Sequence, residues 1–133
     1  MDTVTVSIQT EIKPTENEGK IEKAISNIFG NIKSNIKIGY NSKIFQVEMN
    51  GKESLFRFRD ILRFDQIRNA ARRALFKGIS GTNIIFFLNK QVAFANHVSF
   101  SEEKSESPLG PIRIKINCDE PESLIMWLTP KTE

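Results

Sequence analysis

Hydrophobic and polar residues alternate from the start of the chain, over residues 3–12. Val4, Val6 and Ile8 fall on one side of this stretch, whereas polar residues fall on the other. Alternation with a period of two is typical of a β-strand that buries one face and leaves the other in solvent. We therefore expect residues 3–12 to form a half-buried strand.

A helical period follows, with hydrophobic residues three or four positions apart over residues 16–29. Thr15 and Glu18, at the start of this run, have the spacing of a capping box, and Gly30 comes directly after its end. The side chains of a capping box accept hydrogen bonds from the free N–H groups at the start of a helix. A glycine after the end allows the backbone turn that satisfies its last carbonyls. The pattern predicts one amphipathic helix between Thr15 and Gly30.

A second helical region covers residues 52–77, and its hydrophobic face changes direction partway along. The change falls at Phe64-Asp65, so we expect two helices with a junction at that point. A last short helix is predicted at residues 121–128, where Asp119 can act as a cap before it and Pro130 can end it.

Short hydrophobic runs between turn residues predict the remaining strands: residues 36–40, 43–49, 84–88, 92–100 and 112–116. The first two should form a hairpin around Asn41-Ser42, and the next two should be joined near Asn89-Lys90. The fold class expected is α+β, with an antiparallel sheet of about five strands and the helices packed on one face. Seven side chains should then lie in the core: Val6, Ile8, Ile25, Ile67, Leu75, Phe86 and Ile114.

Composition fits a single folded unit. The chain has 133 residues, of which 39% are hydrophobic and 26% charged, and we expect one α+β domain over residues 1–133. No hydrophobic run approaches the roughly 18 residues of a membrane span, and the first residues lack the pattern of a secretion signal. We therefore expect a cytoplasmic protein with no membrane partner. The single cysteine, Cys118, excludes an intramolecular disulfide.

Charge is unevenly distributed, because six of the seven arginines lie within 17 residues of one another. With one lysine they form the candidate contact for phosphate or nucleic acid: Arg57, Arg59, Arg63, Arg68, Arg72, Arg73 and Lys77. The alternative is a solvated helix face on which Asp60 and Asp65 pair with arginines. Helical spacing distributes the charges around the helix instead of along one stripe, so both interpretations stay open.

The sequence offers little catalytic chemistry. His97 and Ser99 lie two positions apart, but a nucleophile and its base also need an orienting acid and an oxyanion pocket. The acids between Asp119 and Glu122 are better explained as the start of a helix than as magnesium ligands. Residues 78–81 lack the lysine and the strand-then-helix order of a phosphate loop. We predict no catalytic residue, no metal and no cofactor.

Aromatic side chains give a test of RNA binding, because open sheets that bind single strands use rings that stack on bases. The polar face of the first predicted strand has no aromatic residue. Phe87, with Ile85, makes the second face of its strand hydrophobic, and we expect it to pack in the core or against a second copy of the chain. Any RNA binding should therefore be weak, non-specific and dominated by salt.

Three stretches carry a resemblance to a known family: the helix at residues 64–72, the segment at residues 88–94, and Pro108-Leu109-Gly110-Pro111-Ile112 continued by residues 127–132. Together they resemble the archaeal uncharacterised protein family 0201, with similar spacing over nearly the whole chain. Members more often have Asp before the tryptophan, where this chain has Met126. The resemblance implies a fold like that of the large-subunit ribosomal protein that holds the five-S RNA, and it supplies no catalytic residues.

The function predicted from these observations is a non-enzymatic binding or interaction domain, whose cellular role the sequence leaves open. Two alternatives remain: a true RNA-binding protein that uses the Arg57–Lys77 patch, or an enzyme with a site that its sequence does not reveal. Besides RNA, the partner expected is a second copy of the chain, in a homodimer.

Overall fold

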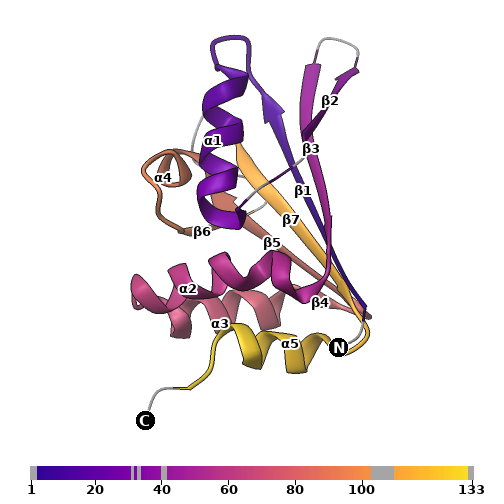
Figure 1. The fold of residues 1–133 in the computed structure, drawn as a ribbon, viewed down its shortest axis with the longest axis vertical. Helices are drawn as coiled ribbons and strands as arrows, with labels where there is room; N and C mark the ends of the chain where they lie inside the picture. Colours follow the sequence, from indigo (N-terminus) through magenta and orange to yellow (C-terminus); the bar gives the residue numbers. More distant parts are fainter. Residues whose placement is uncertain (1–2, 31, 33, 40–41, 103–109, 132–133) are drawn as a thin grey trace.

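The computed structural model describes residues 3–30, 32, 34–39, 42–102 and 110–131 (Figure 1). The strands are β1 (Val4–Ile12), β2 (Ser34–Gly39), β3 (Ser42–Asn50), β4 (Ile79–Ser80), β5 (Asn83–Asn89), β6 (Phe100–Ser101) and β7 (Pro111–Cys118). The helices are α1 (Glu18–Phe29), a 3₁₀ turn η1 (Lys52–Leu55), α2 (Phe56–Phe64), α3 (Arg68–Lys77), α4 (Lys90–Phe94) and α5 (Pro121–Leu128). None of the helices described is long and apolar enough to cross a membrane.

The strands form one antiparallel sheet in the order β2-β3-β1-β7-β5-β4, and β6 also pairs with β5. Figure 1 shows the helices gathered on one face of this sheet, which confirms the predicted α+β fold class. The described sheet has seven strands where about five were expected. The difference comes from β4 and β6, which are two residues long and lie along the same edge of β5.

The core lies between the helices and the sheet face formed by alternate residues of β1, β3, β5 and β7. Three rings stack through it, with centroids 5.3 Å apart for Phe29 and Phe58 and 5.8 Å for Phe58 and Phe86. Six of the seven predicted core residues are buried, and Ile67 is only partly buried because it stands at the junction of α2 and α3. Burial of this continuous hydrophobic face is the main stabilising contribution.

The predicted junction between two helices is confirmed, since α2 ends at Phe64 and α3 begins at Arg68. Between them Gln66 adopts a φ of 58°, which is uncommon for a residue other than glycine. The backbone N–H of Ile67 donates to the Leu62 carbonyl at 3.1 Å and closes the turn. The two helices therefore meet at a sharp corner, which we call the α2–α3 corner.

Two predicted helix caps are wrong. The N-cap of α1 is Asn17, whose Oδ1 accepts a hydrogen bond from the Lys20 N–H at 3.2 Å, so Thr15 lies outside the helix. The residue before α5 is Glu120, without a capping side-chain hydrogen bond, and Pro121 at the first helical position suits that start. Asn41, in the turn of the predicted hairpin, and residues 108–109, in a stretch that carries the family resemblance, lie outside the described residues.

The strand predicted at residues 92–100 is also wrong. Asn89 Oδ1 accepts a hydrogen bond from the Val92 N–H at 3.0 Å and thereby caps the short helix α4. Strand pairing resumes only at Phe100, where Leu88 is its partner. A local side-chain cap competes with the extended conformation here, because asparagine readily bonds to nearby backbone groups.

Candidate nucleic-acid interface

Three of the seven predicted contact residues hold helices together. The Nε of Arg57 donates to the Asn27 carbonyl at 2.8 Å and so links α2 to α1. The Nε of Arg59 donates to the Trp127 carbonyl at 2.8 Å, which links α2 to α5. Arg72 donates to the Thr129 carbonyl through Nε at 3.1 Å and Nη2 at 2.6 Å, which links α3 to the end of α5. These guanidinium groups satisfy carbonyls that end helices.

Trp127, on α5, is partly buried, and two charged side chains, Lys52 and Arg59, lie over its ring. The Lys52 Nζ lies 4.3 Å from the ring centroid and the Arg59 Cζ lies 5.1 Å from it, while the Phe56 ring centroid is 5.7 Å away. A cation over an aromatic face is attracted by the ring quadrupole. The tryptophan therefore joins α5 to η1 and α2.

Arg63 and Arg68 lie at the α2–α3 corner. With Gln66 and Asn69 they line a surface hollow of about 350 Å³. α3 begins at this hollow, and no side chain caps its first turn. Free N–H groups at a helix start and two guanidinium groups are both suited to an anion such as phosphate. Phe64, beside them in the chain, is 86% exposed.

The expected pairing of Asp60 and Asp65 with arginines is wrong, whereas a solvated helix face without such pairs stays a prediction. Among the described residues no carboxylate lies within 4.0 Å of an arginine. Asp65 contacts His97 instead, with 3.1 Å between Oδ2 and Nδ1. Neither Arg63 nor Arg68 thus forms an ion pair with a described carboxylate.

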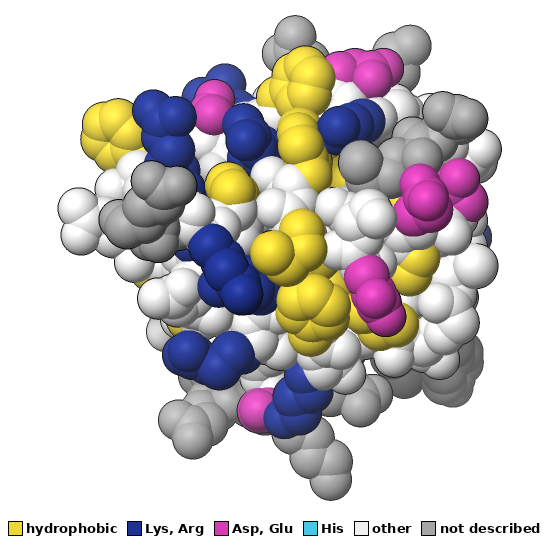
Figure 2. All heavy atoms as spheres, turned by 90° about the horizontal axis from the view of Figure 1, so that it is seen from below, with side chains coloured by type: hydrophobic (Ala, Val, Ile, Leu, Met, Phe, Trp, Pro, Cys, Tyr) yellow, Lys and Arg dark blue, Asp and Glu magenta, His cyan; other side chains and the backbone are white. Residues whose placement is uncertain are grey.

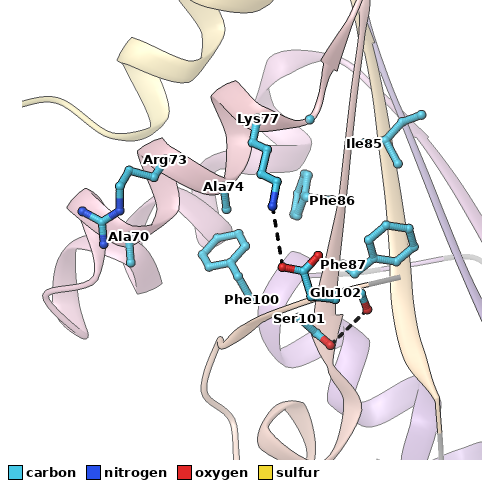
Figure 3. A pocket seen from close by; sticks show the side chains of 11 residues that line it. Ala70, Arg73, Ala74, Lys77, Ile85, Phe86, Phe87, Phe100, Ser101 and Glu102 are labelled. Atoms are coloured by element: carbon cyan, nitrogen blue, oxygen red, sulfur yellow. Dashed lines mark hydrogen bonds and ion pairs between the residues drawn. The ribbon is translucent and has the colours of Figure 1, made fainter. Parts of the chain in front are cut away.

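Arg73 and Lys77 occupy a different place, one helical turn apart on α3. They line a hollow of about 470 Å³ between α3 and the edge of β5, together with Phe87, Phe100 and Glu102 (Figure 3). The Lys77 Nζ points across this hollow to Glu102 Oε1 at 3.7 Å, and the two side chains are 79% and 82% exposed. Such an exposed ion pair is worth less than about 1 kcal/mol.

The predicted arginine and lysine patch is therefore three separate groups instead of one surface. Figure 2 shows the face seen from below Figure 1, where most Lys and Arg side chains lie on one side of a band of hydrophobic side chains and most Asp and Glu side chains on the other. Arg57, Arg59 and Arg72 have structural contacts, Arg63 and Arg68 mark the α2–α3 corner, and Arg73 and Lys77 line the hollow at the β5 edge.

The other residues considered in the sequence for catalysis, phosphate binding or metal binding do not come together in one site. His97 lies in a loop after α4 and makes no hydrogen bond with Ser99 in the structure. Gly78 ends α3, and a Cβ at this position would lie 2.0 Å from the Ile85 carbonyl oxygen, so its role is close packing. Burial raises the pKa of the Cys118 thiol. The described residues hold no group of three potential metal ligands among His, Cys, Asp and Glu.

A buried ion pair is the feature that sequence reasoning missed. Lys90 is 0% exposed, and its Nζ lies 2.7 Å from the Glu11 carbonyl oxygen and 3.0 Å from Glu16 Oε1. Burial lowers the pKa of the Lys90 ammonium from 10.5, and Glu16 opposes this shift through its hydrogen bond and charge. Lys90 lies in the segment at residues 88–94 that carries the family resemblance, and its two contacts link α4 to the end of β1.

Comparison with known proteins gives consistent matches. A family model described as RNA binding matches residues 5–118. A UPF0201 protein of Sulfurisphaera tokodaii is 43% identical over 129 residues, which cover 96% of this chain and 88% of that protein. A UPF0201 protein of Sulfolobus acidocaldarius is 39% identical over 127 residues, with the same coverage of 96% and 88%.

Solved structures agree with the sequence matches. The crystal structure of a UPF0201 protein from Methanococcus jannaschii has a TM-score of 0.84 and 32% identity, and the match covers 95% of this chain and 99% of that one. A DUF54 protein from Methanothermobacter thermautotrophicus shares the fold at a TM-score of 0.60 and 16% identity, over 96% of each chain. On the sequence identities and the shared structure, the chain belongs to the archaeal UPF0201 family, whose members are uncharacterised.

Proposed function

We propose that this protein is a non-catalytic RNA-binding domain that contacts RNA phosphates through Arg63 and Arg68 at the α2–α3 corner. The observation that carries the proposal is the pair of guanidinium groups, without an acidic partner among the described residues, around the hollow at the start of α3. The family model described as RNA binding, matched over residues 5–118, supports RNA as the anion.

A phosphate is bound most easily by a basic side chain that has no hydrogen bond or ion pair within the protein. The seven predicted residues differ in this respect. Arg59 and Arg72 are held by carbonyls of α5, so moving them to a ligand would release those carbonyls. Arg63 and Arg68 make no hydrogen bond or ion pair with another described residue. They can take a phosphate without loss of an internal contact, and Arg presents a fork that matches phosphate oxygens.

The proposed binding is weak and depends strongly on salt. Two or three phosphate contacts give the affinity of non-specific association, with dissociation constants of roughly 10⁻⁴ to 10⁻⁶ M at physiological salt. Phosphate contacts carry no direct information about sequence. The proposal therefore expects similar affinities for RNAs of different sequence, and a steep fall in affinity as salt is added.

The test compares two double variants that remove the same charge. Arg63→Ala with Arg68→Ala should weaken binding of a uridine oligonucleotide of about ten residues. Its plot of log affinity against log salt should be shallower by about 1.4, the value for two lost contacts to a single strand. Lys20→Ala with Lys23→Ala, on the exposed side of α1, should keep most of the affinity. Equal losses in the two double variants would overturn the assignment to the corner.

A further inference from the structure

The sheet has a second face that no described helix covers, and its strand register places a row of side chains across it. Directly paired residues of neighbouring strands point to the same side of a sheet. From β2 to β5 the successive partners are Asn35, Gln46, Gln9, Arg113 and Phe87. With strands roughly 4.8 Å apart, this row, which we call the cross-strand row, is about 19 Å long.

The polar members of the cross-strand row are available to a ligand. Gln9, Gln46 and Arg113 are partly exposed, and their side chains make no hydrogen bond or ion pair with another described residue. They line a surface hollow of about 360 Å³ together with Lys37, Lys115 and one acid, Glu48, so that three cations outnumber it. Amides can donate to and accept from base edges, and the three cations favour a polyanion.

Phe87 gives the row an aromatic end. Figure 3 shows Ile85 and Phe87 on one side of β5 and Phe86 on the other. Phe86 is buried, whereas Phe87 is only partly buried and lies outside the core. Of the two places expected for Phe87, the core is wrong and the contact with a second copy of the chain stays a prediction. Phe87 is partly exposed beside Arg113 and stacks on no described ring. An aromatic ring among polar groups on an open sheet is the arrangement that stacks on unpaired bases.

We infer that the cross-strand row binds single-stranded RNA, with an unpaired base stacked on Phe87 and the adjoining sugar-phosphate held by Arg113. The inference rests on the proposed RNA binding and names the class of RNA. A paired base hides its face within the duplex, so stacking on Phe87 selects single strands. Every base has a face that can stack, so this contact selects little by sequence.

The hollow at the β5 edge extends the same surface toward the helices. Phe87 lines this hollow as well as ending the cross-strand row, and Arg73 and Lys77 lie on its other wall (Figure 3). A strand whose base stacks on Phe87 can thus place its next phosphate beside α3. Glu102 lies at the same hollow and opposes this charge. Of the six arginines and one lysine predicted from the sequence, only Arg73 and Lys77 lie near the cross-strand row.

The test uses a single-stranded RNA of about ten nucleotides that contains one 2-aminopurine, and the same strand paired with its complement. Stacking on Phe87 should quench the fluorescence of the 2-aminopurine. Phe87→Leu keeps the hydrophobic bulk without the ring, so it should abolish this quenching and weaken single-strand binding about tenfold. Binding of the duplex and the salt slope should not change, and Phe87→Tyr should restore both signals.

Three outcomes would overturn the inference. Equal affinity and equal quenching for the wild type and Phe87→Leu would leave Phe87 without a role, even if the variant at Arg63 and Arg68 still loses affinity. A wild type that binds no RNA would overturn both proposals together. If sedimentation shows a dimer that Phe87→Leu converts to a monomer, with RNA binding unaffected, the face is an interface between two copies of the chain.

Discussion

Lys90 shows how much one side chain can matter when it is fully buried. Its ammonium is bonded to the Glu11 carbonyl and to the Glu16 carboxylate, whose second oxygen, Oε2, is buried and lacks a hydrogen bond with any described residue. Each charge depends on the other, because an isolated ion in the interior is far less stable than in water. The pair therefore fixes α4 against the end of β1.

Replacing Lys90 with Met should reduce the free energy of unfolding by about 3 to 5 kcal/mol, because Glu16 would remain as an uncompensated buried charge. Urea unfolding measures this loss. Adding Glu16→Gln should recover part of the stability by removing that charge. Lys20→Met, at an exposed position of α1, is the matched control and should change stability by less than about 0.5 kcal/mol. A loss below about 1 kcal/mol for Lys90→Met would contradict the argument.

Burial of Lys90, which lowers the pKa of its ammonium, makes this loss depend on pH. The pKa of Lys90 is lowered in the folded protein from 10.5, so in the window between the folded value and 10.5 the unfolded chain binds more protons. Stability contributed by Lys90 therefore rises with pH across that window. The difference between the wild type and Lys90→Met should grow as the pH approaches 10.5, and a constant difference would contradict the direction of the shift.

At the scale of elements, α3 carries neighbouring arginines with different tasks. Arg72 bonds twice to the Thr129 carbonyl and holds the end of α5, whereas Arg73 lines the hollow at the β5 edge. Their positions on the helix differ by one residue, and this rotates the two side chains toward different neighbours. Residue type alone thus does not distinguish a helix-joining arginine from one that can contact a ligand.

Single alanine variants should separate these tasks. Arg72→Ala should reduce the free energy of unfolding by about 1.5 to 3 kcal/mol, the value for hydrogen bonds to a charged group, with little loss of RNA affinity. Arg73→Ala should leave unfolding within about 0.5 kcal/mol and lower both the affinity for single-stranded RNA and its salt slope. Thermal unfolding and oligonucleotide titration are the measurements. If both variants lost stability equally, the division of α3 into two faces would be wrong.

The elements that the sequence predicts well are those whose signals are local. Alternation in β1 and the helical period of α1 specify their buried faces, and α5 begins and ends as predicted. The strand expected after residue 91 fails because a single asparagine cap changes the conformation. Local patterns also do not predict which residues of neighbouring strands pair. Gln9, Arg113 and Phe87 are far apart in the sequence and become neighbours only in the sheet, so the cross-strand row could not be predicted.

At the scale of the whole molecule, basic side chains lie both on the helices and on the open face of the sheet. Acidic side chains near them reduce the local positive charge. The net charge of the chain is +3, so single substitutions at a contact surface change the local field appreciably. Glu102 stands opposite Lys77 at the edge that joins the open sheet face to α3. It competes with any phosphate placed there.

Glu102→Gln should therefore increase affinity for single-stranded RNA about two- to fivefold at low salt, and the gain should disappear as salt is raised. The substitution removes a negative charge and releases Lys77 from an exposed ion pair, so stability should change by less than about 1 kcal/mol. Glu22→Gln, at an exposed position of α1 away from both proposed RNA surfaces, is a control with the same change in charge. An equal gain in the control would assign the effect to net charge.

The close packing at Gly78 has a consequence for how an RNA would be accommodated. The backbone of Gly78 touches β5, with its carbonyl accepting the Ile85 N–H at 2.9 Å and no room for a side chain. α3 is thereby fastened to the strand that carries Phe87, and the distance between their ligand-facing groups is set by backbone contacts. A partner must then adapt its own conformation to that spacing, which is easy for a flexible single strand and costly for a stiff duplex.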